Sequence, residues 1–263
     1  MDILKQLSDY ARVRAAEKKR TVSADEMKQR ALDTPLPEKA SFREVLERPG
    51  MSFICECKKA SPSKGLIDPE FPYRRIAEEY VSAGADAISC LTEPKYFLGS
   101  GRYLQEIAAD VPVPVLRKDF IVDPYMIYEA RTLGASAVLL IAAILTREEL
   151  AEYLALTHSL GMDALTEVHD AEEAGIAVSC GAGIIGVNNR NLRDFSVDIN
   201  NSIRLRSQIP ETSLMVAESG IRTREDIIRM EQAGISGVLI GETLMKAKDK
   251  QHMLKELKGE KTV

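Results

Sequence analysis

Eight short apolar runs, each followed by an amphipathic charged segment, predict an α/β chain that closes into a (β/α)8 TIM barrel. Three of the turns that lead into a strand share a small-residue pattern with glycine at the end of the preceding helix, at Gly84, Gly134 and Gly234. An open doubly wound sheet is the main alternative. It would show a G-x-G-x-x-G turn after its first strand if it bound a dinucleotide, and the sequence has none there. The predicted strands are residues 52–58, 87–91, 113–118, 137–142, 164–168, 184–188, 214–218 and 237–240.

The length of 263 residues is usual for one barrel with a short extension, so we expect a single domain over residues 1–263. Residues 1–48 precede the first strand and predict an N-terminal helical extension that packs on the barrel, because Ile3, Leu4 and Leu7 fall at helical spacing. A capping-box pattern that begins at Ser41 restarts a helix shortly before the first strand.

Composition excludes several classes of function. The formal net charge is -5, so the chain lacks the basic footprint of a nucleic-acid-binding protein. No segment approaches the roughly 20 uncharged apolar residues of a membrane span, and the N-terminus lacks a signal-peptide core. We therefore expect a cytoplasmic location, with neither a membrane nor a nucleic acid as partner.

The four cysteines, Cys55, Cys57, Cys90 and Cys180, are interpreted as buried, reduced thiols. Cys55 and Cys57 flank one residue of the first strand, which points both to one face. The three histidines show no ligand spacing, so we expect no metal site.

Polar side chains end five of the predicted strands, where the chemistry of such barrels lies. Taken singly, each is explained by a solvated rim charge or a structural ion pair. Together they predict two lysines and three carboxylates around one small cavity, an arrangement that pushes pKa values apart and assigns acid and base roles. They are Glu56 and Lys58 at the end of the first strand, Lys118 at the end of the third, Glu167 at the end of the fifth, Asn188 and Arg190 at the end of the sixth, and Glu218 with Ser219 at the end of the seventh.

The loops after the last two strands predict a phosphate site, because these loops offer free backbone amides at the start of a short helix. They carry Ser219-Gly220 and Gly241-Glu242. Both glycines let the backbone approach an anion closely, although each could also serve only a tight turn. The sequence therefore favours a small phosphorylated substrate.

Seven segments, in order along almost the whole chain, resemble the indole-3-glycerol phosphate synthase family, which closes the indole ring in tryptophan biosynthesis. The first contains Glu56-Cys-Lys58 followed by Ser61-Pro-Ser63, which is similar to the family motif E-x-K-x-x-S-P-S. The resemblance implies a lyase that converts 1-(o-carboxyphenylamino)-1-deoxyribulose 5-phosphate to indole-3-glycerol phosphate, CO2 and water without any cofactor. The segments are residues 54–65, 91–100, 116–123, 166–169, 186–192, 216–221 and 238–242.

The resemblance also implies roles. Lys118 is the general acid toward the ketone oxygen, Glu167 the base or proton shuttle, and Lys58 holds the substrate and is a second candidate for the acid in dehydration. A lysine donates more readily if burial or a second lysine lowers its pKa, and we expect this of Lys118.

The remaining implied site residues form the walls of the pocket. Ser61 lies where the family binds the anthranilate carboxylate. The apolar slot for the aromatic ring consists of Phe97, Phe120 and Leu140, and the polar wall of Glu56, Asn188, Arg190, Glu218 and Ser219.

Two alternatives remain open at this point. A sugar-phosphate isomerase of the phosphoribosylanthranilate isomerase type shares the fold, but is not expected to carry Glu56 and Lys58 with the Ser61-Pro-Ser63 segment. A non-catalytic phosphate-binding barrel would need neither an acid at Lys118 nor a base at Glu167. The sequence also leaves open whether the chain works alone or makes transient contact with other enzymes of tryptophan biosynthesis.

Overall fold

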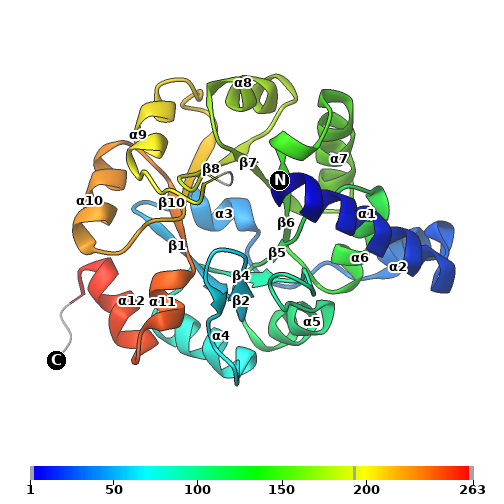
Figure 1. Cartoon of the computed structure of the whole chain (residues 1–263), viewed down its shortest axis with the longest axis horizontal. Coiled ribbons are helices and arrows are strands. Elements are labelled where there is room, and N and C mark those ends of the chain that lie inside the picture. Colours follow the sequence, from blue (N-terminus) through cyan, green and yellow to red (C-terminus); the bar gives the residue numbers. More distant parts are fainter. Residues whose placement is uncertain (1–2, 192–193, 261–263) are drawn as a thin grey trace.

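The eight apolar runs form eight parallel strands that close into a barrel, which confirms the predicted fold (Figure 1). This computed structural model describes residues 3–191 and 194–260, so Leu192 at the end of one of the seven segments lies outside the described residues. Sequence neighbours pair in order around the ring, and the last strand pairs with the first. The strands are β1 (Ser52–Cys57), β4 (Ala87–Leu91), β5 (Val115–Lys118), β6 (Ala137–Ile141), β7 (Asp163–Val168), β8 (Ile184–Asn188), β9 (Leu214–Glu218) and β10 (Gly237–Ile240).

The largest difference from the predicted strands is at β5, which begins at Val115 rather than at residue 113. Pro114 has no backbone N–H and cannot donate to a ladder, so the strand starts directly after it. Its carbonyl still accepts a hydrogen bond from the Ile88 amide of β4.

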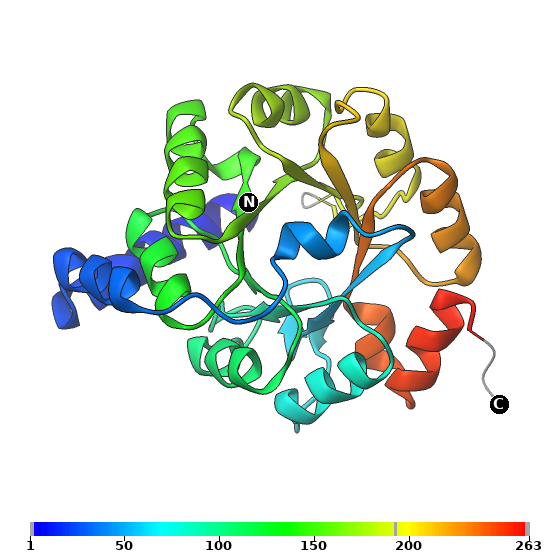
Figure 2. The ribbon, with the colours of Figure 1, turned by 180° about the vertical axis from the view of Figure 1, so that it is seen from behind.

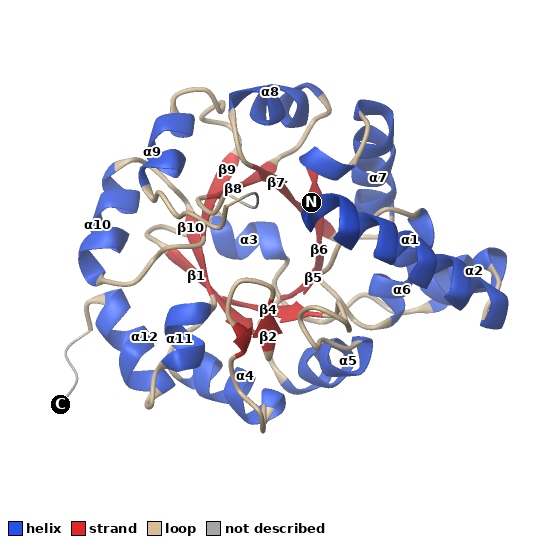
Figure 3. Ribbon diagram, viewed as in Figure 1, coloured by secondary structure: helices blue, strands red, loops and turns tan. Residues whose placement is uncertain are grey.

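Helices form a ring outside the strands (Figure 3). A short antiparallel hairpin, β2 (Ala60–Ser61) with β3 (Gly65–Leu66), stands in the loop after β1. The helices are α1 (Ile3–Thr21), α2 (Ala24–Asp33), α3 (Phe42–Leu46), α4 (Tyr73–Ser82), α5 (Gly101–Asp110), α6 (Pro124–Thr132), η1 (Ala142–Ile144), α7 (Arg147–Ser159), α8 (Ala171–Ser179), α9 (Asn200–Arg206), α10 (Arg224–Gln232), α11 (Glu242–Lys246) and α12 (Lys250–Lys258).

Helix α3 closes the end of the barrel at which the strands begin (Figure 2). The expected capping box is present, since the Ser41 side chain accepts from the Glu44 amide and the Glu44 carboxylate accepts from the Ser41 amide. Leu46 packs so closely on β10 that a Cβ on Gly237 would lie 2.7 Å from its side chain. The cavity described below is therefore open only at the other end.

Helix α1 is fastened to the barrel by ion pairs near the end of β5. Arg14 makes two bonds to the Asp119 carboxylate, at 2.7 and 3.2 Å, and both side chains are buried. Lys18 pairs with Glu129 of α6, and Lys19 pairs with Asp123, which directly precedes α6. Asp119 directly follows Lys118, so the extension is tied to the strand end that carries this lysine.

Cys55, Cys57 and Cys90 are buried free thiols, as expected. Cys180 is only half-buried, because it follows the last turn of the surface helix α8. Among the described helices, none has both the length and the apolar character that a membrane crossing requires.

Candidate active site

A cavity of about 380 Å³ opens at the carboxyl ends of the strands. Strand alternation explains its lining, because residues two apart on a strand face the same side. Every site residue expected from the sequence lines this cavity except Leu140. They are Glu56, Lys58, Ser61, Phe97, Lys118, Phe120, Glu167, Asn188, Arg190, Glu218, Ser219, Gly220, Gly241 and Glu242.

The expectation for Leu140 is wrong by one residue. In β6 it is Leu139 and Ile141 that line the cavity, and Ile141 is in register with Glu167 of β7. Leu140 lies between them on the strand, so it points to the opposite face and is fully buried in the layer under the helices. An unbroken apolar strand gives no sequence signal for which face is which.

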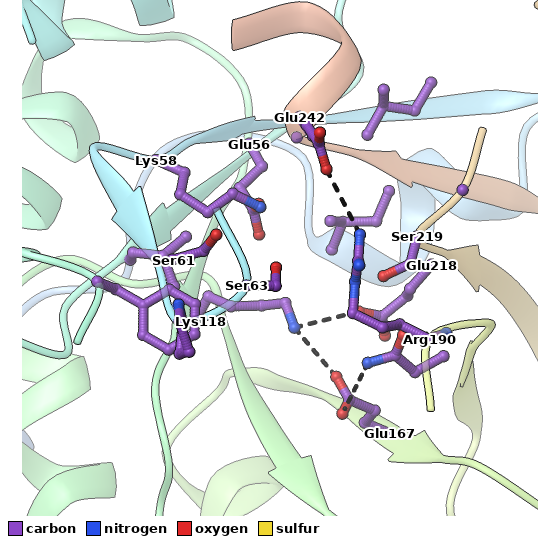
Figure 4. A pocket seen from close by; sticks show the side chains of 18 of the residues that line it. Glu56, Lys58, Ser61, Ser63, Lys118, Glu167, Arg190, Glu218, Ser219 and Glu242 are labelled. Carbon is purple, nitrogen blue, oxygen red and sulfur yellow. Dashed lines mark hydrogen bonds and ion pairs between the residues drawn. The ribbon is translucent and has the colours of Figure 1, made fainter. Parts of the chain in front are cut away.

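Lys118 lies between two carboxylates near the centre of the cavity (Figure 4). Its Nζ is 3.0 Å from Oε2 of Glu167 and 3.2 Å from Oε2 of Glu218. The three side chains are 14%, 3% and 2% exposed, so little water screens these ion pairs.

The charge on Lys118 is therefore stabilised, contrary to the sequence expectation. Burial lowers its pKa, but the facing carboxylates of Glu167, Glu218 and Glu56 outweigh burial and raise the pKa above its ordinary value. The second lysine that the sequence predicted nearby is Lys58. It is paired with Glu56, so the carboxylate offsets its charge near Lys118. Lys118 is therefore a protonated acid.

The two carboxylates beside Lys118 differ in their other partners. Glu167 also accepts a hydrogen bond from Asn188 at 3.3 Å and faces His169. Burial raises the pKa of Glu167, but Lys118 and His169 outweigh it and the pKa lies below the ordinary value. For Glu218, burial outweighs the attraction of Lys118 and raises the pKa to about 7, with the nearby charge of Glu167 adding to the rise. Its Oε1 has no hydrogen-bond partner among the described residues.

Glu56 and Lys58 form an ion pair at the end of β1, beside the loop that carries Gly241. A Cβ on Gly241 would lie 2.1 Å from Oε1 of Glu56 and 2.9 Å from Nζ of Lys58. Gly241 is therefore required by this close approach, in addition to the backbone access predicted from sequence.

The loops after β9 and β10 form the other end of the cavity. Ser219 and Gly220 both have positive φ, 68° and 85°, which turns the chain sharply after β9. Helix α11 begins at Glu242, so its first backbone N–H groups have no partner within the helix.

Three cations converge on the Glu242 carboxylate: Lys246 at 2.8 Å, and Arg190 and Lys64 at 3.5 Å each. A carboxylate repels a phosphate, so only the backbone N–H of Glu242 is suited to bind one. The expected phosphate role of Glu242 is thus restricted to its main chain.

Phe97 and Phe120 form an apolar wall, with ring centroids 6.0 Å apart. The loop that carries Phe97 is held by the buried carboxylate of Glu93, which accepts hydrogen bonds from the amides of Lys95, Tyr96 and Phe97. Sequence analysis missed Glu93, although a carboxylate two to four residues before these amides is a recognisable turn signal.

Other lining residues were also missed. Ile3 and Leu7 of α1 reach the cavity, so the extension forms part of its wall. Ser63 and Lys246 line the cavity from surface segments whose placement no local pattern gives. Lys64 does not line the cavity, but it pairs with the lining residue Glu242. Among residues 3–191 and 194–260, no cluster of three or more His, Cys, Asp or Glu side chains could hold a metal ion.

Comparison with known proteins gives a consistent result. Residues 4–257 match the profile of a family described as indole-3-glycerol phosphate synthase. A protein of that name from Lacticaseibacillus paracasei is 49% identical over 256 residues, covering 97% of this chain and 98% of its own. Another from Lachnoclostridium phytofermentans is 47% identical over 268 residues, covering 98% and 99%.

Solved structures confirm the fold. The chain superposes on a 3-hexulose-6-phosphate synthase with a TM-score of 0.65 and 14% identity, covering 80% of this chain and 99% of that one. A thiamine phosphate pyrophosphorylase from Pyrococcus furiosus gives a TM-score of 0.59 and 16% identity, covering 80% and 94%. At such identities only the barrel itself is shared.

Proposed function

The chain belongs to the indole-3-glycerol phosphate synthase family, and we propose that its reaction takes place in the cavity around Lys118. The chain is a decarboxylating lyase of tryptophan biosynthesis. It converts 1-(o-carboxyphenylamino)-1-deoxyribulose 5-phosphate to indole-3-glycerol phosphate, CO2 and water. The observation that carries the assignment of the site is the buried lysine between two carboxylates of unlike pKa.

The first chemical step is attack of the carboxylate-bearing ring carbon on the ribulose ketone. Negative charge develops on the ketone oxygen, and the protonated Lys118 is its general acid. The substrate displaces water from the cavity, which strengthens this interaction. Loss of CO2 then restores the aromatic ring.

The second step is loss of the new hydroxyl as water together with a proton. Lys58, which also lines the cavity, is the second acid and also holds the substrate. Glu167 is the base, because its pKa is held low and its carboxylate is ionised. Glu56 positions Lys58 through their ion pair, and Asn188 orients Glu167.

Both ends of the substrate have suitable walls. The aromatic ring fits against the apolar wall of Phe97 and Phe120, with Ser61 near its carboxylate. The phosphate fits the turn at Ser219-Gly220 and the start of α11, within reach of Arg190. Anchoring both ends lowers the entropic part of the barrier, since the ring must fold back over the ribulose chain.

The experiment is a fluorescence assay of the purified chain with the carboxyphenylamino-deoxyribulose phosphate, in the presence of a chelator and without nucleotide. We expect indole fluorescence to appear with multiple turnovers. A folded sample that binds phosphate but produces no indole would contradict the proposal. Phosphoribosylanthranilate serves as the control substrate and should not be isomerised.

We further propose that residues 1–263 act as one domain, in the cytoplasm, without nucleic acid or a membrane as partner. The net charge of -5 and the ion pairs that bind α1 to the barrel support this. Size-exclusion chromatography and a single cooperative unfolding transition would test it. Transient contact with other tryptophan-pathway enzymes would appear as co-elution at high concentration.

A further inference from the structure

His169 lies just after β7 and faces the base from the side opposite Lys118. Its Nε2 is 3.5 Å from Oε1 of Glu167, whereas Lys118 contacts Oε2. Each oxygen of the Glu167 carboxylate thus has its own nitrogen partner. The Nε2 atom is buried and has no hydrogen-bond partner within the described chain, so Glu167 is the group that it faces.

Glu173 fixes the orientation of the histidine ring. Its Oε2 accepts a hydrogen bond from the His169 backbone amide at 2.7 Å and lies 3.1 Å from Nδ1 of the ring. Asn201 donates to the His169 carbonyl oxygen at 2.9 Å. Main chain and ring are therefore both held, and Nε2 can only point inward to Glu167.

This geometry favours the imidazolium form. Because Nδ1 faces a carboxylate, it carries a proton, and a neutral ring would then turn the lone pair of Nε2 toward another carboxylate. A charged ring presents an N–H on both sides instead. Burial lowers the pKa of His169, but Glu173 and Glu167 outweigh burial and raise it above the ordinary value.

We propose that His169 is a positioning residue that gives Glu167 a second positive partner, so that Glu167 stays ionised after Lys118 has released its proton to the substrate. The proposal rests on the proposed function, since it takes Lys118 as the acid and Glu167 as the base. Without His169, the neutral lysine would leave a buried carboxylate with no cation beside it. Such a carboxylate takes up a proton and no longer serves as a base.

Glu218 is the natural comparison for Glu167. It also pairs with Lys118, but among the described residues no second ion pair of its carboxylate is present, and its pKa is raised to about 7. The same lysine thus contacts two buried carboxylates that differ in their outer partners. His169, together with the hydrogen bond from Asn188, distinguishes Glu167 from Glu218.

Other charges around His169 do not replace its effect. Glu218 acts on it from β9, and the described residues of the outer cavity that the ring lines include, besides His169, three basic and three acidic side chains, so these charges balance. Among the described carboxylates, those of Glu167 and Glu173 lie within 3.5 Å of the ring nitrogens. The charged residues of this outer cavity are Lys5, Asp170, Glu173, Arg190, Asp198 and Arg204.

The test is the pH profile of kcat for His169→Gln. Loss of the positive charge raises the pKa of Glu167, so the acid limb of the profile should move up by about one pH unit. On the acid limb itself, where turnover follows the ionised fraction of Glu167, kcat should then fall about tenfold, with recovery at higher pH, and KM should change little. Because Glu218 also titrates, with a pKa of about 7, the comparison is repeated in a Glu218→Gln background.

Two further variants keep the test decisive if His169→Gln does not fold. Glu173→Gln retains the histidine but weakens its charge, so it should move the limb in the same direction by less. Glu172→Gln, on the neighbouring exposed residue of α8, should leave the limb in place.

An acid limb that stays in place in folded His169→Gln or Glu173→Gln would overturn the proposal. A loss of kcat that is equal at every pH would do so too, because it would show a structural role only. Absence of indole formation by the unaltered chain would instead contradict the proposed function.

Discussion

The two ends of the cavity hold their charges in different ways. Around Lys118 the side chains are at most 14% exposed, and the partners lie within 3.2 Å. Around Glu242 the cations Lys64 and Lys246 are 39% and 54% exposed. The first end is assembled before the substrate arrives, and its charges face the reacting atoms. At the second end, partly exposed cations pair with the Glu242 carboxylate, and a phosphate would compete with that carboxylate for them. Rate should therefore depend on the first end and affinity on the second.

The largest effect is expected at the buried end, for Lys118→Ala. Removing the acid should lower kcat about 10³-fold, in the range of general acid catalysis, with little change in KM. Steady-state kinetics of the ring closure measure both constants. Lys246→Ala is the matched control at the exposed end and should act mainly on KM. A near-normal kcat in Lys118→Ala would mean that the ion-paired lysine is not the acid.

A smaller effect at the same end is expected for Glu218→Gln. The raised pKa of about 7 means that Glu218 is protonated below this pH and ionised above it. Once ionised, it holds the proton of Lys118 more tightly, so kcat of the unaltered enzyme should decline as pH rises through 7. The neutral variant cannot ionise at this position, so it should flatten this decline, with up to about a tenfold difference in kcat from the unaltered enzyme at the alkaline end. A pH–rate profile from 5.5 to 9 measures it; an unchanged inflection would assign the titration to another group.

At the exposed end, Gly220→Ala should raise KM about tenfold and leave kcat nearly unchanged. The residue has a φ of 85°, and a Cβ there would lie 2.5 Å from Val197 Cγ1. The turn must shift, which disturbs the amides offered to phosphate. Inhibition by inorganic phosphate should weaken in parallel. A fall in kcat alone would place the phosphate elsewhere.

The smallest effect, and one of opposite sign, is expected for Glu242→Gln. Removing the carboxylate frees Arg190, Lys64 and Lys246 for the phosphate, so phosphate should inhibit roughly threefold more strongly. Inhibition constants at low ionic strength measure this. Weaker inhibition would show that the carboxylate organises the cations rather than competing for them.

The sequence predicted the strands and most of the site because both follow from alternation. Glu56 and Lys58 flank one residue, and so they share a face, whatever the rest of the chain does. The prediction that Leu140 lines the cavity failed because β6 is apolar on both faces. The prediction of a lowered pKa for Lys118 failed because its neighbours, Glu167 and Glu218, come from other strands. Their distances from Lys118 depend on how the barrel closes. His169 was within a recognised segment, but its partner Glu173 lies on the next helix.

The anchoring of α1 also has a consequence for synthesis. Arg14 is made 105 residues before its partner Asp119. At 5–20 residues per second, this interval is roughly 5–20 s on the ribosome. During that time the face of α1 that carries Leu7, Ala11 and Ala15 has no barrel to pack on. The first helix to be translated is therefore among the later ones to dock, and nascent chains shorter than about half the protein expose it to chaperones and proteases.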